Sequence, residues 1–176
     1  MENSILIFDI SHLASKPVGE TQRYSFAGEE DFEGINLDGP IKGKVEIMRI
    51  DEGFNVKVEE FFAGMKSQCE KCLKKFAQTI EIPFMERLFW LETPPKGEDQ
   101  GLIHFVDKKK LTINITEMLR QEIILHFPLT LVCSPHCKGL CPICGKDRNK
   151  VKCKCKPDET AENKHKPFAG LKNLLK

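Results

Sequence analysis

The stretch that decides how this chain is organised reads Cys133-Ser134-Pro135-His136-Cys137-Lys138-Gly139-Leu140-Cys141-Pro142-Ile143-Cys144-Gly145, and Cys153-Lys154-Cys155 closes it. Six of the eight cysteines fall within these 23 residues, a density that indicates either disulfides or a metal site. The sequence does not begin with the basic and apolar segments of a secretory signal, so we expect a cytoplasmic protein. Structural disulfides are rare in that reducing compartment, and metal binding is therefore the expected role of the cysteines.

The strongest local motif is the C-x-x-C-G run that starts at Cys141. Two cysteines at this spacing present both thiolates from one tight turn, and the glycine that follows permits the positive φ that such a turn often needs. Two more cysteines follow after a short polar loop and can complete the tetrahedron of ligands that zinc prefers. The spacing therefore predicts a closed structural zinc site with the ligands Cys141, Cys144, Cys153 and Cys155.

A second C-x-x-C, Cys69 to Cys72, lies between two segments with the pattern of strands. This is the spacing of a zinc knuckle, although a redox pair or plain thiols are alternatives. By elimination, we expect a second four-thiolate site with the ligands Cys69, Cys72, Cys133 and Cys137. Two other arrangements stay open, one in which His136 replaces a cysteine and one in which Cys137 joins Cys141 and Cys144.

The first two thirds of the chain have the pattern of an antiparallel sheet. Apolar and charged residues alternate over 41–50 and again over 54–59, and Asp51-Glu52-Gly53 between them supplies turn chemistry, so these segments predict a hairpin. One helix is predicted, capped by Asn114 with Glu117 three residues later and stopped by Pro128. Shorter extended patterns occupy 5–10, 80–91 and 102–106. We expect an α+β fold, with an antiparallel β-sheet or partly closed barrel, one main helix and a C-terminal zinc-knuckle module.

The chain has 176 residues, which suits one body with a small appended module. We expect a β-rich body over 1–128, a cysteine-rich module of zinc-ribbon type over 129–156 and a tail over 157–176. The tail could form a short amphipathic helix, with one apolar side made of Phe168, Leu171, Leu174 and Leu175. No apolar run is long enough to predict a membrane-spanning helix.

Charge is divided unevenly along the chain. Residues 1–128 hold 16 basic and 22 acidic side chains, whereas 129–176 hold 11 basic and 4 acidic ones. A basic end on an acidic body indicates an anionic partner, although lysines that only solvate a small module are the alternative. No aromatic residue lies in the basic loop, which favours phosphate contact over base stacking. The candidate RNA-binding residues are Lys146, Arg148, Lys150, Lys152, Lys154 and Lys156.

Three motifs in order resemble the YceD-type large ribosomal RNA subunit accumulation proteins. They are Leu37-Asp38-Gly39-Pro40-Ile41-Lys42-Gly43-Lys44-Val45, then Cys69-x-x-Cys72-Leu73, then Arg120 to Leu129 with the cysteine-rich stretch behind it. The resemblance covers 37–155. It implies a bacterial or plastid protein that acts in the accumulation or processing of the large-subunit ribosomal RNA and has no established catalytic activity.

Three functional hypotheses follow. The first is a non-enzymatic zinc-binding factor that supports large-subunit ribosomal RNA by binding RNA or pre-ribosomal particles. The second is an adaptor that docks a ribosomal protein or a processing factor, and the third is a redox sensor with exposed thiols. We do not expect an enzyme, because the sequence contains no paired carboxylates, G-x-S-x-G, P-loop or H-E-x-x-H motif.

Overall fold

The computed structural model describes residues 4–92 and 103–155. The chain divides into two compact units. One, here called the body, takes Met1–Gln68 and Lys75–Leu131, and the other, here called the cysteine unit, takes Cys69–Lys74 and Val132–Lys176. The loop between two strands of the body thus belongs to the cysteine unit, which is built from two segments far apart in sequence.

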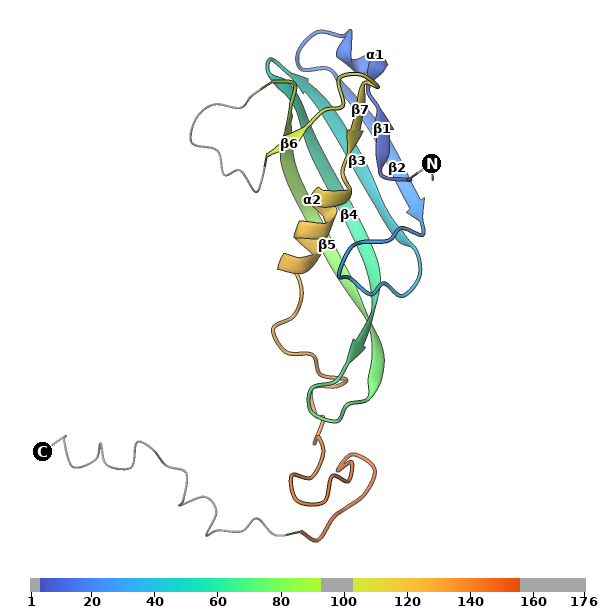
Figure 1. The fold of residues 1–176 in the computed structure, drawn as a ribbon, viewed down its shortest axis with the longest axis vertical. Helices are drawn as coiled ribbons and strands as arrows, with labels where there is room; N and C mark the ends of the chain where they lie inside the picture. Colours follow the sequence, from blue (N-terminus) through green and yellow to red (C-terminus); the bar gives the residue numbers. More distant parts are fainter. Residues whose placement is uncertain (1–3, 93–102, 156–176) are drawn as a thin grey trace, which may run out of the picture. The chain divides into compact units, whose positions relative to one another are not determined.

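The main sheet of the body has five strands in the order β2-β3-β4-β5-β6. The strands β2 (Thr21–Gly28), β3 (Ile41–Ile50), β4 (Gly53–Gln68) and β5 (Lys75–Trp90) follow each other as an antiparallel meander (Figure 1). The last strand, β6 (His104–Phe105), lies parallel to β5. The sheet is therefore mixed and open at both edges. The expectation of an antiparallel sheet holds for four of its strands, and the described strands do not form a closed barrel.

The hairpin of β4 and β5 is the longest feature of the body. Both strands have 16 residues, and they pair from Gly53 opposite Trp90 to Gln68 opposite Lys75. The pairing has one gap, at Pro83, because proline has no amide hydrogen to donate. Apolar residues alternate with polar ones, so one face is buried and the other meets solvent. The strands predicted here were too short, since β4 runs nine residues beyond the last position of the alternation noted in sequence.

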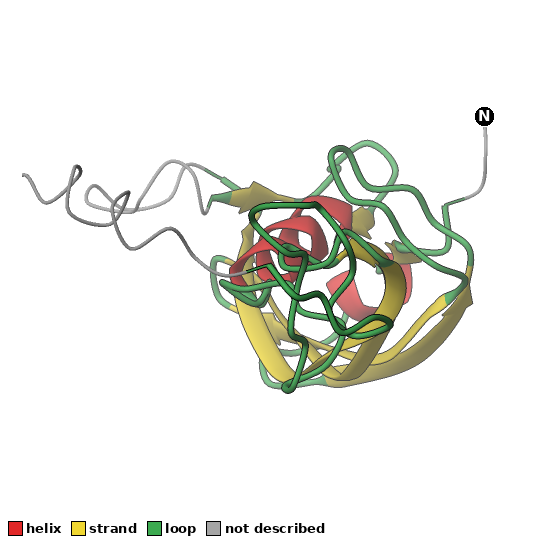
Figure 2. Ribbon diagram, turned by 90° about the horizontal axis from the view of Figure 1, so that it is seen from below, coloured by secondary structure: helices red, strands yellow, loops and turns green. Residues whose placement is uncertain are grey.

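The buried face of the sheet curves around a second layer (Figure 2). This layer contains the helices α1 (Ser11–Ala14) and α2 (Thr116–Leu125), and a small antiparallel sheet of β1 (Ile7–Asp9) and β7 (Thr112–Asn114). The apolar stripe of α2 is fully buried at Met118, Leu119 and Ile123. These side chains share one core with the inward residues of the sheet, among them Phe54, Phe61 and Phe89.

The predicted helix is present, but its start differs in detail. The N-cap position is Ile115, and no side chain caps the helix there; Asn114, one residue earlier, accepts a hydrogen bond from the Thr116 amide (2.9 Å). The Glu117 carboxylate accepts hydrogen bonds from Arg120 and Gln121 on the helix itself, so the expected capping box does not form. Within the described part of the chain, no helix is long and apolar enough to cross a membrane.

Candidate metal centres

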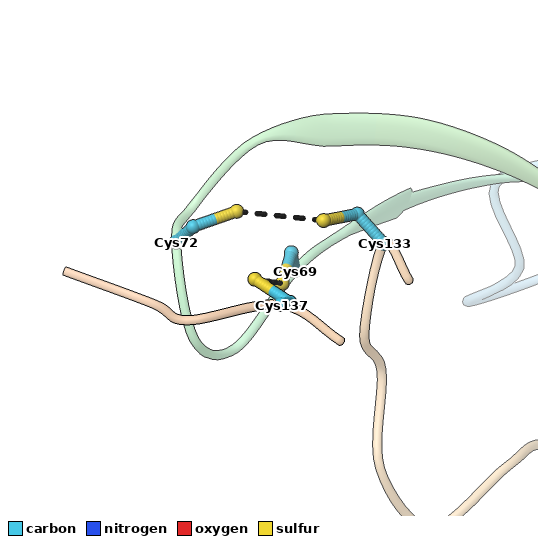
Figure 3. Close-up of side chains that lie close together, drawn as sticks. All are labelled: Cys69, Cys72, Cys133 and Cys137. Atoms are coloured by element: carbon cyan, nitrogen blue, oxygen red, sulfur yellow. Dashed lines mark hydrogen bonds between the residues drawn. The ribbon is translucent and has the colours of Figure 1, made fainter. Parts of the chain in front are cut away.

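The first candidate centre gathers four cysteines of the cysteine unit, Cys69, Cys72, Cys133 and Cys137. Their sulfur atoms face one another (Figure 3), with Cys69 Sγ 3.8 Å from Cys137 Sγ and Cys72 Sγ 3.6 Å from Cys133 Sγ. Zinc–sulfur bonds of about 2.3 Å at the corners of a tetrahedron hold the sulfurs about 3.8 Å apart. The observed separations therefore fit a four-thiolate metal site, and they are far too long for disulfide bonds.

The second candidate centre gathers Cys141, Cys144, Cys153 and Cys155, whose sulfur atoms lie within 4.8 Å of one another. Cys141 is buried, Cys153 is half-buried and Cys144 is exposed. The structure thus groups the cysteines into the same two sets that were expected from the sequence. His136 is exposed and belongs to neither set, and Cys137 lies in the first set, apart from Cys141 and Cys144.

The two C-x-x-C turns share one hydrogen-bond pattern. In the first turn, the Cys69 amide donates to the Lys74 carbonyl (2.9 Å) and the Leu73 amide donates to the Cys69 carbonyl (2.8 Å). In the second turn, the Cys141 amide donates to Lys146 and the Gly145 amide donates to Cys141, both at 2.9 Å. The backbone thus closes each turn at the same two positions, with both thiols on the inside.

The thiol pKa values within each set are pushed apart. Burial raises the pKa of Cys69, but backbone hydrogen bonds from Cys133, Cys72 and Lys71 outweigh it and lower the pKa to about 6. Backbone amides of Cys144 and Ile143 likewise lower the pKa of Cys141 to about 6. Hydrogen bonding with Cys72 raises the pKa of Cys133 to about 12, and hydrogen bonding with Cys144 does the same for Cys155. A nearby divalent cation is what would let all four thiols ionise together.

Asn149 connects the basic loop to the first centre. Its side-chain amide donates to Cys137 Sγ (3.4 Å) and to the Asp147 carboxylate (2.8 Å), and its carbonyl oxygen accepts from the Lys138 amide (2.8 Å). A hydrogen bond to a ligand sulfur fixes the direction of that ligand. Sequence reasoning did not assign Asn149 a role, although an Asn two residues after an Asp in a turn is a signal of local side-chain bonding.

Gly139 connects the two centres through the backbone. Its φ is +69°, and a Cβ atom there would lie 2.9 Å from the Lys71 carbonyl oxygen, so a glycine is required on both counts. The Leu140 amide donates to that same carbonyl (2.8 Å), and the Arg148 amide donates to the Gly139 carbonyl (3.0 Å). The turn between Cys69 and Cys72 is thereby fastened to the segment that carries the second centre.

Five of the six candidate RNA-binding residues lie in sequence between Cys144 and Cys155 of the second centre. Those that the structure describes are all exposed, namely Lys146, Arg148, Lys150, Lys152 and Lys154. Lys156 lies outside the described residues, as does the predicted tail helix. Asp147 is the one acidic residue between 133 and 155, and the backbone amide of Asn149, with its side-chain amide, lowers the pKa of its carboxyl group.

The family model described as "Large ribosomal RNA subunit accumulation protein YceD" matches residues 62–175 of this chain. The chain belongs to the YceD family. The family takes its description from ribosomal RNA accumulation and not from a reaction. Its match includes all eight cysteines, and thus both candidate centres.

Curated relatives come from plants and mycobacteria. The chain is 36% identical over 72 residues to the chloroplastic YCED homolog 1 of Arabidopsis thaliana, which is 41% of this chain and 21% of that protein. It is 43% identical over 56 residues to the Zea mays homolog, 31% of this chain and 19% of that protein. An uncharacterized Mycobacterium tuberculosis protein is 25% identical over 125 residues, 62% of this chain and 59% of that protein.

The chain therefore spans about a fifth of the plant YceD homologs and 59% of the mycobacterial relative. No solved structure gives a significant match to the chain.

Proposed function

We propose that this chain is a non-enzymatic zinc-binding factor that supports the accumulation, processing or assembly of the large-subunit ribosomal RNA by contacting RNA or a pre-ribosomal particle. The observation that carries the proposal is the exposed basic loop of a YceD-family chain, which lies in sequence between the cysteines of a four-cysteine centre. The cytoplasm, where ribosomes are assembled in bacteria, is the location that goes with it.

Zinc is the metal that the donor atoms favour. Four cysteine sulfurs at tetrahedral distances select zinc or an iron–sulfur cluster, and the separations of 3.6 and 3.8 Å fit a single ion. Four protein ligands fill the coordination sphere of zinc, which is typical of structural and not catalytic sites. Zinc would then stabilise the fold of the cysteine unit. Atomic emission on the purified chain tests this, with two zinc ions per chain expected and none contradicting the proposal.

Charge supports RNA contact by the cysteine unit. Its described residues carry eight basic and two acidic side chains. Each zinc ion with four thiolates adds a charge of −2, so a unit with both sites loaded keeps a net charge of about +2. The exposed cations lie outside the sulfur clusters and can still approach phosphates, which supply most of the non-specific affinity of proteins for nucleic acid.

The exposed face of the body is a poorer candidate for RNA contact. Positive and negative side chains alternate across four neighbouring strands in the cross-strand row Arg23, Glu46, Lys57 and Glu86. Arg23 and Glu46 form an ion pair at 2.6 Å, and Lys57 pairs with Glu59 at 2.6 Å. A face on which opposite charges pair presents little net field to a polyanion.

A triple charge reversal tests the proposal. We expect Lys150→Glu, Lys152→Glu and Lys154→Glu together to abolish the binding of ribosomal RNA, measured by filter binding at two salt concentrations, while two zinc ions remain bound. The matched control reverses three exposed lysines in a turn of the body, Lys108, Lys109 and Lys110. Equal RNA affinity in the two variants would sink the proposal.

The adaptor hypothesis is the alternative, and one observation favours it. Phe84 and Leu88 lie exposed on the solvent face of β5, with exposed fractions of 49% and 38%. A ribosomal protein or processing factor docked there would co-purify with the triple-Glu variant as well as with the unchanged chain. Loss of that co-purification on Phe84→Ser with Leu88→Ser, at unchanged RNA affinity, would support the adaptor.

A further inference from the structure

The cysteine unit contains a hollow beside the second centre. Its volume is about 410 Å³, within the roughly 300–1,000 Å³ typical of small-ligand sites. Its walls differ in chemistry. One part is apolar and includes Ile143 and Val151, which are 56% and 50% exposed, and another part consists of the three cations Lys138, Arg148 and Lys152.

Hydrogen bonds fix the backbone that carries these cations. The Lys138 amide is bonded to the side chain of Asn149, and the Arg148 amide is bonded to Gly139. The Val151 amide donates to the Asp147 carbonyl (3.0 Å), so the turn that brings Arg148 and Lys152 to the same hollow is closed. A backbone that is already closed loses less conformational entropy on binding than a free loop does.

Charge favours an anionic occupant. No acidic side chain is among the described residues that line the hollow. Zinc with four thiolates would bring a charge of −2, and three cations exceed it, so the hollow would stay positive with the metal bound. Arg148 adds a planar guanidinium, which can bind two phosphate oxygens at once or stack on a base.

We infer that this hollow is a binding site for one unpaired ribonucleotide, with the base against Pro142, Ile143 and Val151 and the phosphates against Lys138, Arg148 and Lys152. The inference rests on the proposed RNA contact and makes it more specific. A base inside an A-form helix is stacked and cannot reach an apolar wall, whereas an unpaired base can be turned out onto it. The apolar wall compensates for the lack of aromatic residues in the loop.

The test uses the zinc-loaded full chain and two labelled probes, a 12-nucleotide single-stranded RNA and the same sequence as a duplex. The first variant, Ile143→Ser with Val151→Ser, changes no charge. The serine side chains bury less apolar surface against a base, so we expect roughly a tenfold loss of affinity for the single strand, no change for the duplex and an unchanged salt dependence. Zinc content and circular dichroism check the fold, and Phe84→Ser with Leu88→Ser on the body is the matched control.

The second variant, Arg148→Gln with Lys152→Gln, removes two cations. We expect weaker binding of both probes and a salt slope that falls by about one for each phosphate that is no longer bound. If this variant weakens binding but the serine variant does not, the ribonucleotide site is overturned and the proposed RNA contact stands. If the unchanged chain binds neither probe, the proposed function itself fails. Loss of a co-purifying ribosomal protein from the serine variant, at unchanged RNA affinity, would assign the hollow to protein and overturn the inference.

Discussion

The two C-x-x-C turns of the cysteine unit are alike in backbone and different in surroundings. Both use the same two hydrogen bonds, and the residue after the second cysteine has a positive φ in each, +58° at Leu73 and +68° at Gly145. In the first centre Cys69, Cys72 and Cys137 are buried, whereas in the second centre Cys144 is exposed. One turn geometry therefore serves an enclosed centre and an open one.

The difference suggests a division of roles. The enclosed centre joins two segments that are about 60 residues apart, so a metal bound there would stabilise the arrangement of the unit. The open centre takes all four cysteines from one stretch of 15 residues, and the exposed cations gather around it. We expect the first centre to hold metal more tightly and the second to lie nearer to the RNA.

Removing one ligand from each centre gives the largest expected effect. Cys72→Ser and Cys144→Ser should each reduce zinc from two ions per chain to one, because a site with three thiolates loses most of its affinity. Cys72→Ser should also lower the thermal unfolding temperature more, since it frees the loop between β4 and β5. Loss of both ions from Cys144→Ser would contradict the independence of the centres.

The two centres should respond to acidification, and they should release zinc to a chelator at different rates. Zinc binding requires thiolates and releases protons, so zinc affinity falls as the pH falls below the pKa of about 12 at Cys133 and Cys155. The fall should become steeper below the pKa of about 6 at Cys69 and Cys141, where these thiols take up protons as well. Each centre has one thiol with a pKa of about 6, so this pKa does not distinguish the centres. We therefore expect burial to decide which centre releases zinc first. A chelator at constant pH should remove zinc in two phases of equal size, the open centre first, measured with a colorimetric zinc indicator.

A comparison of two single variants assigns each phase of zinc release to one centre. Cys144→Ser should lack the fast phase and Cys72→Ser the slow one. A single phase in the unchanged chain, or the reverse assignment, would mean that burial does not control release.

Substitutions of Asn149 test the role of its hydrogen bond to Cys137 Sγ. Partners that orient metal ligands contribute about 10- to 100-fold to affinity, so Asn149→Ala should speed zinc release from the first centre by a factor near tenfold. Asn149→Asp keeps the oxygen that accepts from Lys138 but lacks the N–H that donates to Cys137. Similar slow-phase rates for the Asp variant and the unchanged chain would show that this N–H has no such role.

Alanine substitutions at two glycines have the smallest expected effect and form the most closely matched pair. Gly139 and Gly145 have nearly the same φ, +69° and +68°, so alanine should cost roughly 1–2 kcal/mol of backbone strain at either position. A Cβ at Gly145 meets nothing within 4 Å, whereas a Cβ at Gly139 meets the Lys71 carbonyl at 2.9 Å. Gly139→Ala should therefore destabilise the zinc-loaded unit further, measured by guanidinium unfolding. Equal destabilisation by the two variants would show that the close approach to Lys71 is dispensable.

Patterns of alternation and spacing predicted much of this molecule. The hairpin turn at Asp51, the helix that starts beside Asn114 and the cysteine set of 141–155 come from local rules that fix which side chains share a face or a turn. The set that joins Cys69 and Cys72 to Cys133 and Cys137 came from elimination, because these were the four cysteines left over. The strands β2 and β7 were missed. Thr21–Gly28 contains Gln22, Arg23 and Tyr24 on a half-exposed edge, and Thr112–Asn114 is too short to show a period.

The contacts between distant segments could not be predicted. Nothing local in Gly139 indicates that Lys71 lies against it, and Asn149 reaches Cys137 only after both turns have formed. The hollow needs Lys138, Ile143 and Val151 to meet, and their spacing follows no strand or helix period. Such features depend on packing in three dimensions, which a single sequence does not report.

The two-segment origin of the cysteine unit also sets an order for its assembly. A metal bound by Cys141 to Cys155 closes a short loop, while a metal bound by Cys69 and Cys137 must close one that spans 68 positions, and the entropy cost of closure grows with loop length. The open centre can thus form first from its own stretch of chain. With zinc bound, the enclosed centre would act as a cross-link that restricts the unfolded chain, as a disulfide does in an oxidising compartment, and the supply of zinc would make or break it.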